Sequence, residues 1–243
     1  ARGGGPAKLV EGAGRKSTTR NKGDDRGRPP STPAKGRGGP PPRAGEDFQD
    51  LQLCTLVDAV PTGSAWLHEV KYDGYRALIS VANGKAKVFT RTGLDWTEKF
   101  AAIAAAAAKL PVKSALIDGE IVAFKNGHPD FSTLKDAISA GGDMTLFAFD
   151  LLALDGEDLT GLSNLDRKAR LQPLIPEDED RLRYSDHVIG AGEQLFETMC
   201  REGLEGIVSK RADAPYVGKR TKAWLKVKCT HRQEFVIVGW LPS

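Results

Sequence analysis

The sequence predicts an α+β fold in which antiparallel sheets are flanked by helices, preceded by a disordered basic linker. Apolar runs of strand length follow one another across tight-turn signals such as Asn83-Gly84, which is typical of hairpins. Helical segments are interleaved with these runs, but not in the strict strand–helix–strand order of a parallel sheet. The linker is predicted because residues 1–45 contain half of the 14 prolines and no aromatic residue.

Residues 1–45 also differ from the rest of the chain in charge. They contain 11 Lys or Arg and 3 Asp or Glu, a net charge of +8, whereas residues 46–243 carry −5. Such a segment cannot bury enough apolar surface to offset the entropy lost on ordering. Its charge suits loose contact with nucleic acid, and it also suits a solvated linker between domains. We favour the linker, and the two interpretations are compatible.

The sequence from residue 66 to residue 139 predicts four strands and two helices. The strands before and after Asn83-Gly84 form a hairpin, and an alanine-rich run forms a strong helix that Pro111 ends. The strand that follows has an acidic centre. In chain order the predicted elements are strands at 66–72, 75–82 and 85–90, a helix at 97–110, a strand at 114–124 and a short helix at 131–139.

The second half predicts a buried strand, two amphipathic helices and a strand-rich end. The buried strand is a long apolar run that Asp155-Gly156 closes. The elements are a strand at 144–154, helices at 164–175 and 192–203, and strands at 205–210, 223–228 and 234–240. Because the chain begins without Met and ends in a strand-like segment, both ends are expected to be cut from something longer.

Cysteine, histidine and apolar patterns exclude several classes of protein. Cys54, Cys200 and Cys229 are odd in number, lie far apart and form no CxxC pair, which predicts neither a disulfide framework nor a zinc site. This usage fits a reducing cytoplasm. The four histidines show no HxxxH spacing, and no apolar run is long enough to cross a membrane.

The stretch "KYDGYR" places Lys71 on a predicted strand among apolar neighbours, two residues before Asp73. Side chains alternate along a strand, so Lys71 and Asp73 are expected to face the same way. Gly74 lets the chain bend where a ligand could approach closely. Taken alone, an ordinary Asp-Gly turn beside a chance lysine explains the stretch at least as well.

Similar polar interruptions occur in several other apolar segments. A buried carboxylate or lysine is costly unless it is paired or binds a metal, so interruptions in separate strands suggest one shared polar site. Lysines, carboxylates and an aromatic residue together describe a site for a nucleotide and its metal. The interruptions are "TRTG" at 90–93, "DGE" at 118–120, "FAFD" at 147–150, "EGIVSK" at 205–210 and "AWLKVK" at 223–228.

In this order the segments resemble the nucleotidyltransferase motifs of ATP-dependent DNA ligases, from motif I at "KYDGYR" to motif V at "LKVK". Residues 50–240 look most like the adenylation domain of the bacterial non-homologous end-joining ligase, ligase D. The full ordered series is highly specific, whereas the likeness of the tail to the linker of that multi-domain protein is much weaker. The resemblance implies a nucleotidyltransferase (ATP-grasp-like) fold and DNA ligase activity.

Lys71 matches the nucleophile of that family. Its amine would attack the α-phosphate of ATP, release pyrophosphate and hold AMP as a phosphoramidate. The AMP would pass to the 5′-phosphate of nicked DNA, and the 3′-hydroxyl would displace it. A free lysine has a pKa of about 10.4, so it becomes nucleophilic only if it is desolvated or set among other cations. A strand position near Lys226, Lys228 and a bound metal could supply both conditions.

The resemblance also implies roles around the nucleoside. Glu69 matches the position that reads the adenine amino group, which would favour ATP over GTP. Phe149 matches the aromatic residue that stacks on adenine; a plain core phenylalanine is the alternative, and Phe147 shares its parity along the strand. Arg76 and Arg91 match residues near the ribose and the nick phosphate.

A further set of residues matches positions that handle phosphate, metal and DNA. Glu120 matches a ribose or metal contact and Glu205 the carboxylate of the metal, Mg²⁺ or Mn²⁺. Lys226 and Lys228 match the phosphate-binding pair, with Lys210 as a supporting cation. Asp73, together with Arg91, could position the ends of the nick, and Asp150 could be structural.

The family resemblance extends to domains and partners. We expect a linker at 1–45, an adenylation domain at 46–232 and, at 233–243, the start of a truncated OB-fold domain that would bear motif VI. The implied partners are nicked or broken double-stranded DNA, Ku, and polymerase and phosphoesterase modules of the same polypeptide, with no membrane. The implied process is DNA repair in the bacterial cytoplasm, at the nucleoid.

Two other functions compete with this one. An RNA ligase or an mRNA capping enzyme shares the same motifs, although capping enzymes use GTP and Glu69 argues against that. A catalytically silent nucleic-acid-binding or scaffold module would have lost Lys71 or the carboxylates, yet all are present.

Overall fold

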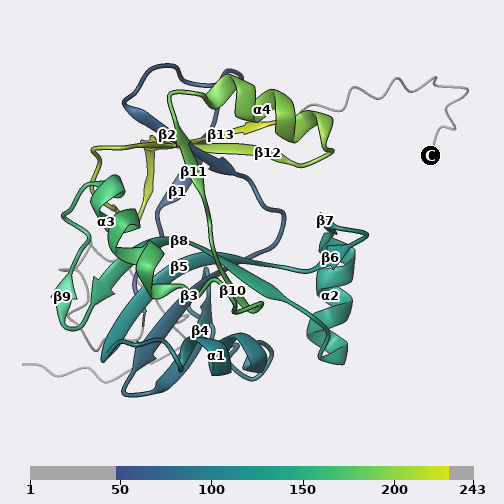
Figure 1. Ribbon diagram of the computed structural model, residues 1–243, viewed down its shortest axis with the longest axis vertical. Helices are drawn as coiled ribbons and strands as arrows, with labels where there is room; N and C mark the ends of the chain where they lie inside the picture. Colours follow the sequence, from purple (N-terminus) through teal and green to yellow (C-terminus); the bar gives the residue numbers. More distant parts are fainter. Residues whose placement is uncertain (1–47, 230–243) are drawn as a thin grey trace, which may run out of the picture. The chain divides into compact units, whose positions relative to one another are not determined.

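The computed structural model describes residues 48–229. The linker expected at 1–45, the strand expected at 234–240 and the OB-fold start expected at 233–243 lie outside the described residues. Within the described range the chain forms two larger β-sheets with flanking helices (Figure 1), which confirms the predicted α+β class.

The first sheet has the strand order β10-β8-β5-β3-β4. The β3/β4 hairpin turns at Asn83 and Gly84, both with left-handed backbone angles (φ 51° and 72°), as the sequence predicts. The strands are β3 (Tyr75–Ala82), β4 (Lys85–Thr90), β5 (Ser114–Val122), β8 (Thr145–Leu154), β9 (Glu157–Asp158), which pairs with β8, and β10 (Leu182–Tyr184).

The second sheet has the order β1-β13-β12-β2-β11. Its edge pair β1 and β13 is parallel, as is the pair of β10 and β8 in the first sheet, so the expectation of purely antiparallel sheets is wrong at these edges. Long connections bring these strands together, which a parallel pair requires. The strands are β1 (Leu53–Leu56), β2 (Trp66–Val70), β11 (His187–Ile189), β12 (Gly206–Arg211) and β13 (Arg220–Lys228), and a separate small hairpin contains β6 (Phe124–Lys125) and β7 (His128–Pro129).

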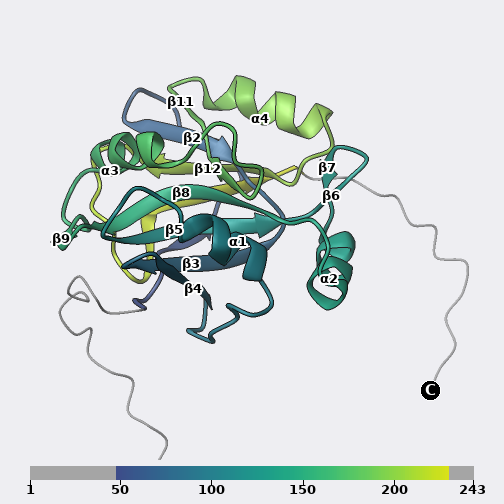
Figure 2. The same ribbon diagram turned by 60° about the horizontal axis from the view of Figure 1, so that its bottom comes forward.

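The two sheets face each other, and helices cover their outer faces. Figures 1 and 2 show α4 (Gly192–Arg201) over the second sheet, and α1 (Ala101–Ala107) lies beneath the first sheet in Figure 1 and in front of it in Figure 2. Alternate side chains of each strand pack on opposite faces: Ile79 of β3 joins the helix-covered core, whereas Leu78 joins a core shared with Trp224 of β13. The inward faces of both sheets therefore enclose one common space.

Two of the described helices begin at capping side chains. α2 (Phe131–Ala140) begins after Asp130, whose carboxylate accepts a hydrogen bond from the Thr133 amide, and ends at Gly141 in the left-handed region. α3 (Asn164–Leu171) begins after Ser163, which accepts from the Asp166 amide, and continues as a short 3₁₀ turn, Gln172–Leu174. α1 is shorter than the predicted 97–110, because residues 97–100 form turns. In the part of the chain that the structure describes, no helix is long and apolar enough to cross a membrane.

A disulfide joins Cys200, at the end of α4, to Cys229, just after β13. The two Cα atoms are 5.3 Å apart because α4 lies along the outer face of the second sheet, beside the end of β13. The interpretation that the cysteines form no disulfide is therefore wrong for this pair. Their separation of 29 residues gave no local signal.

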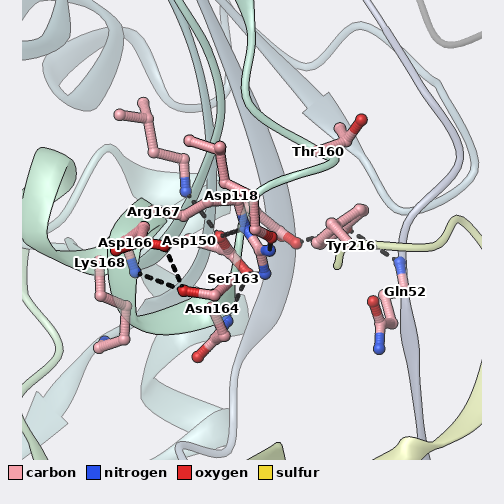
Figure 3. Close-up of polar contacts among 12 residues, drawn as sticks. Gln52, Asp118, Asp150, Thr160, Ser163, Asn164, Asp166, Arg167, Lys168 and Tyr216 are labelled. Carbon is pink, nitrogen blue, oxygen red and sulfur yellow. Dashed lines mark hydrogen bonds and ion pairs between the residues drawn. The ribbon is translucent and has the colours of Figure 1, made fainter. Parts of the chain in front are cut away.

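A buried ion pair anchors α3 to the first sheet (Figure 3). Both oxygens of Asp150 in β8 accept from Arg167, from Nε at 2.7 Å and from Nη2 at 2.9 Å. The Asn164 amide donates to the same carboxylate at 3.1 Å. All three side chains are fully buried, so each charge has a partner where water is excluded.

Replacing Arg167 with Met should leave the Asp150 carboxylate buried without its cation and lower the free energy of unfolding by about 3–5 kcal/mol. Arg170 on the same helix is a matched control, because its pair with Glu157 is exposed and Arg170→Met should cost about 0–1 kcal/mol. Urea denaturation measures both values. Losses of equal size would show that the buried pair does not anchor the helix.

Candidate active site

A cavity of about 220 Å³ lies between the inward faces of the two sheets. Strands of both sheets contribute to its walls, so residues far apart in sequence meet there. The residues predicted from the sequence that line it are Glu69, Lys71, Arg76, Arg91, Glu120, Phe149, Lys210 and Lys226. Glu205 and Lys228 are linked to this set through Lys71.

Strand register brings the residues of the first sheet together. Arg76 of β3 lies directly opposite Glu120 of β5, and both point toward the second sheet. Phe149 lies at a β-bulge in β8, where the register with β5 shifts between Ala148 and Asp150. A bulge re-aims a side chain relative to its neighbours, and here Phe149 lines the cavity.

Phe149 and Phe147 have different surroundings despite their shared parity in sequence. The Phe149 ring meets Trp224 edge-to-face, with centroids 6.0 Å apart, and forms part of the cavity wall. Phe147 instead stacks on Tyr72, with centroids 4.1 Å apart, and does not line the cavity. The sequence analysis missed Trp224, although it shares the parity of Lys226 along β13.

Arg76 is fixed by Asp118. Its guanidinium contacts both carboxylate oxygens, from Nε at 2.5 Å and from Nη2 at 2.6 Å, and lies 4.5 Å from the centre of the Phe149 ring. The Tyr216 hydroxyl donates to Asp118 at 2.7 Å and accepts from the Gln52 amide at 2.9 Å (Figure 3). Burial alone would lower the pKa of Arg76, but Asp118 outweighs it and the pKa is raised.

Glu69 is fully buried and is held by two lysines. One oxygen lies 2.7 Å from Lys168 of α3 and the other 2.7 Å from Lys210 of β12. Burial alone would raise the pKa of Glu69, but the two lysines outweigh it and lower the pKa. Sequence analysis missed Lys168, because nothing in an amphipathic helix marks which of its cations turns inward.

Lys71 lies just beyond the end of β2, where its amide donates to the Gly206 carbonyl at 2.9 Å. Its amine pairs with Glu205, whose other oxygen lies 2.8 Å from Lys228. The expectation that Lys71 and Asp73 share one face of a strand is wrong: the strand ends at Val70, and Asp73 is exposed and does not line the cavity. A role of Asp73 in positioning DNA ends stays a prediction.

Gly74 and Gly206 permit two close backbone contacts beside Lys71. A Cβ on Gly74 would lie 2.1 Å from the Ile121 carbonyl oxygen, so the close approach there is to β5 rather than to a ligand. Gly206 has φ 138°, and a Cβ would lie 2.1 Å from the Val227 carbonyl oxygen. Any larger residue at either position would displace the backbone that carries the site.

Two carboxylates lie with Lys71 at the cavity: Glu205 pairs with its amine, and Glu120 lines the same cavity. Burial raises the pKa of Glu120 to about 7, although Arg76 and Lys71 act in the opposite direction. Among residues 48–229, no three His, Cys, Asp or Glu side chains gather into a complete metal site. Two carboxylates nevertheless fit Mg²⁺ or Mn²⁺, because such ions commonly take one or two protein carboxylates and complete their shell with substrate phosphates and water.

Residues 52–228 match the family model described as the ATP dependent DNA ligase domain. A relative from Pseudomonas aeruginosa, the multifunctional non-homologous end joining protein LigD, is 39% identical over 193 residues, which cover 78% of this chain and 23% of the relative. The protein of that name from Mycolicibacterium smegmatis is 34% identical over 197 residues, covering 80% and 26%. The chain thus spans about a quarter of these relatives.

Solved structures agree with the sequence relatives. The ligase domain from M. tuberculosis LigD superposes with a TM-score of 0.67 and 31% identity, covering 74% of this chain and 59% of that chain. A mycobacterial DNA ligase D complexed with ATP and MES superposes with a TM-score of 0.66 and 31% identity, covering 74% and 60%. The nucleotidyltransferase fold expected from the motifs is confirmed.

The raised pKa of Glu120 predicts a pH-dependent stability. The folded protein holds this proton more tightly than the unfolded chain, so the contribution is complete below the ordinary pKa of 4.5 and is lost as the pH rises toward 7. Glu120→Gln cannot ionise, so its stability does not include this loss. In metal-free buffer, the free energy of unfolding of Glu120→Gln minus that of the parent should increase by about 1–3 kcal/mol from pH 4 to pH 8.

The check is urea denaturation of both proteins across this pH range. The exposed Glu98 supplies the matched control, and Glu98→Gln should follow the parent at every pH. A stability difference between Glu120→Gln and the parent that stayed constant with pH would contradict the raised pKa.

Proposed function

Because the chain belongs to the ATP-dependent DNA ligases, we propose that it forms the adenylation domain of a bacterial end-joining ligase. Lys71 would accept AMP from ATP and pass it to the 5′-phosphate of a nick or break. One observation carries the proposal: the Lys71 amine lies at a cavity that also contains an aromatic wall, a buried carboxylate and a cluster of cations. These are the groups that a nucleoside triphosphate needs.

The cavity offers complementary contacts for adenosine. The Phe149 ring supplies a flat apolar wall for the base, and Glu69 supplies an acceptor for its amino group. Arg76, fixed by Asp118, and the exposed Arg91 line the same cavity and would contact the ribose and a nick phosphate. A carboxylate in contact with the base favours adenine, because guanine presents an oxygen at the same position and two acceptors repel.

The reaction requires a neutral Lys71 amine. Lys71 must release a proton before its lone pair attacks the α-phosphorus, and the bond to pyrophosphate breaks as the new N–P bond forms. Glu205 accepts from Lys71 at the start and holds the amine in place. Lys226 in the cavity and Lys228 at its edge would bind phosphate oxygens, and Lys210 adds charge beside the base.

Glu120 and Glu205 would hold Mg²⁺ or Mn²⁺ together with the phosphates. A bound divalent ion supplies charge neutralisation at the phosphate oxygens. Glu205 would then be shared between the ion and Lys71, so the ion pair that holds the Lys71 amine would be weaker.

The wider setting of the reaction is also a proposal. We propose nicked or broken double-stranded DNA as substrate, and Ku with polymerase and phosphoesterase modules as partners, because the relatives are named multifunctional end joining proteins. The domain limits at 1–45, 46–232 and 233–243 belong to this proposal. Its location would be the bacterial cytoplasm, at the nucleoid, where Cys200 and Cys229 would meet reducing conditions.

The competing functions have less support. An RNA ligase or capping enzyme would use the same lysine, but the relatives described above are named end joining proteins. A silent binding module has no need of Lys71 and Glu205 in direct contact.

Lys71→Ala and Lys71→Arg should each abolish covalent labelling by ATP that carries a labelled α-phosphate, because Arg stays protonated and cannot attack phosphorus. The exposed Lys222 on β13 provides a matched control, and Lys222→Ala should be labelled as well as the parent. Labelled protein is measured after denaturing electrophoresis, and pyrophosphate should remove the label. Labelling of the Arg variant would refute the assignment of Lys71.

A further inference from the structure

Lys168 is a buried lysine on α3 that no step of the proposed reaction uses. Only 1% of it is exposed, and its amine lies 2.7 Å from Glu69 and donates to the Ser185 carbonyl at 2.8 Å. The same amine lies 4.5 Å from the centre of the Tyr184 ring. Burying an ammonium group is costly unless such partners compensate.

Lys168 and Lys210 contact different oxygens of Glu69, and only Lys210 lies at the cavity. Lys210 lines the cavity and contacts one carboxylate oxygen, whereas Lys168 does not line the cavity and contacts the other. Each carboxylate oxygen can accept two hydrogen bonds, so Glu69 keeps capacity for a further donor. Lys168 thereby orients the carboxylate, and with it the lone pairs that can still accept a hydrogen bond. It does so without occupying the space for the base.

The charge of Lys168 also keeps Glu69 ionised. Burial acts to raise the pKa of Glu69, and the charge of Lys168 is the strongest influence that lowers it. An ionised carboxylate is an acceptor only, whereas a protonated one can donate. Recognition of an amino group, and rejection of an oxygen in its place, therefore depend on the ionised form.

The position of Lys168 depends on the anchored helix. Ser163 caps α3, and the neighbouring Arg167 binds Asp150 in the first sheet (Figure 3). With the helix held there, Lys168 extends to Glu69 in the second sheet. α3 thus connects the two sheets by two adjacent buried ion pairs.

We propose that Lys168 is a positioning residue for nucleotide selection, which holds the Glu69 carboxylate so that it reads the 6-amino group of adenine. This inference rests on the proposed role of Glu69 in adenine recognition. A residue with only a structural role would affect the reaction of every nucleotide alike. A positioning residue would affect chiefly nucleotides that carry the 6-amino group.

The test compares two nucleotides with labelled α-phosphates: ATP and purine riboside triphosphate, which lacks the 6-amino group. The second-order rate constant of covalent labelling, which is the labelling rate divided by the nucleotide concentration, is measured for each nucleotide. A hydrogen bond to a charged group contributes enough that the parent should prefer ATP by about tenfold or more. Lys168→Met and Lys168→Gln should lose most of this preference through slower labelling by ATP, while Arg170→Met, on the same helix, should retain it.

Each other outcome has a distinct meaning. Equal losses with both nucleotides, or an unchanged preference, would overturn the role of Lys168 and leave the ligase proposal intact. Unfolding of both Lys168 variants in thermal melts at the assay temperature would assign Lys168 to stability and likewise overturn it. A parent without preference would refute adenine recognition by Glu69 and this inference with it. A parent that neither nucleotide labels would refute the proposed function itself.

Discussion

Charged side chains buried between two sheets must be paired, and these pairs determine where the groups of the site lie. An unpaired carboxylate or ammonium group in such a place would cost several kcal/mol. Asp118 therefore fixes Arg76, and two lysines fix Glu69. The partners come from different strands and from a helix. The geometry of the site is therefore correct only when these elements are packed correctly.

The same principle separates fixed groups from reactive ones. The pairs of Glu69 are fully buried and have no solvent to replace them. Lys71 is half-buried at the end of a strand, and its partner Glu205 also contacts the more exposed Lys228. Phosphate and a metal ion can exchange with these groups at modest cost, since partly exposed ion pairs contribute little to stability. The proposed chemistry takes place where the charges are least firmly bound.

Strands and site residues with a strong local signal could be predicted from the sequence. The hairpin at Asn83-Gly84 and the apolar run of β8 follow directly from turn chemistry and hydrophobicity. The short edge strands β1, β10 and β11 were missed, because three or four residues carry no clear period. The bulge that separates Phe149 from Phe147 and the inward turn of Lys168 depend on tertiary packing. The Cys200–Cys229 pair depends on how α4 lies against its sheet.

A crystal structure of the protein after incubation with ATP and Mg²⁺ would test directly whether the cavity binds the nucleotide. We expect AMP bonded to the Lys71 amine, with adenine against Phe149 and its amino group within hydrogen-bond distance of Glu69. Lys168 and Lys210 should still contact Glu69, and Glu205 should have turned from Lys71 toward the metal ion. AMP attached to another residue, or adenine bound outside the space between the sheets, would contradict this assignment of the site.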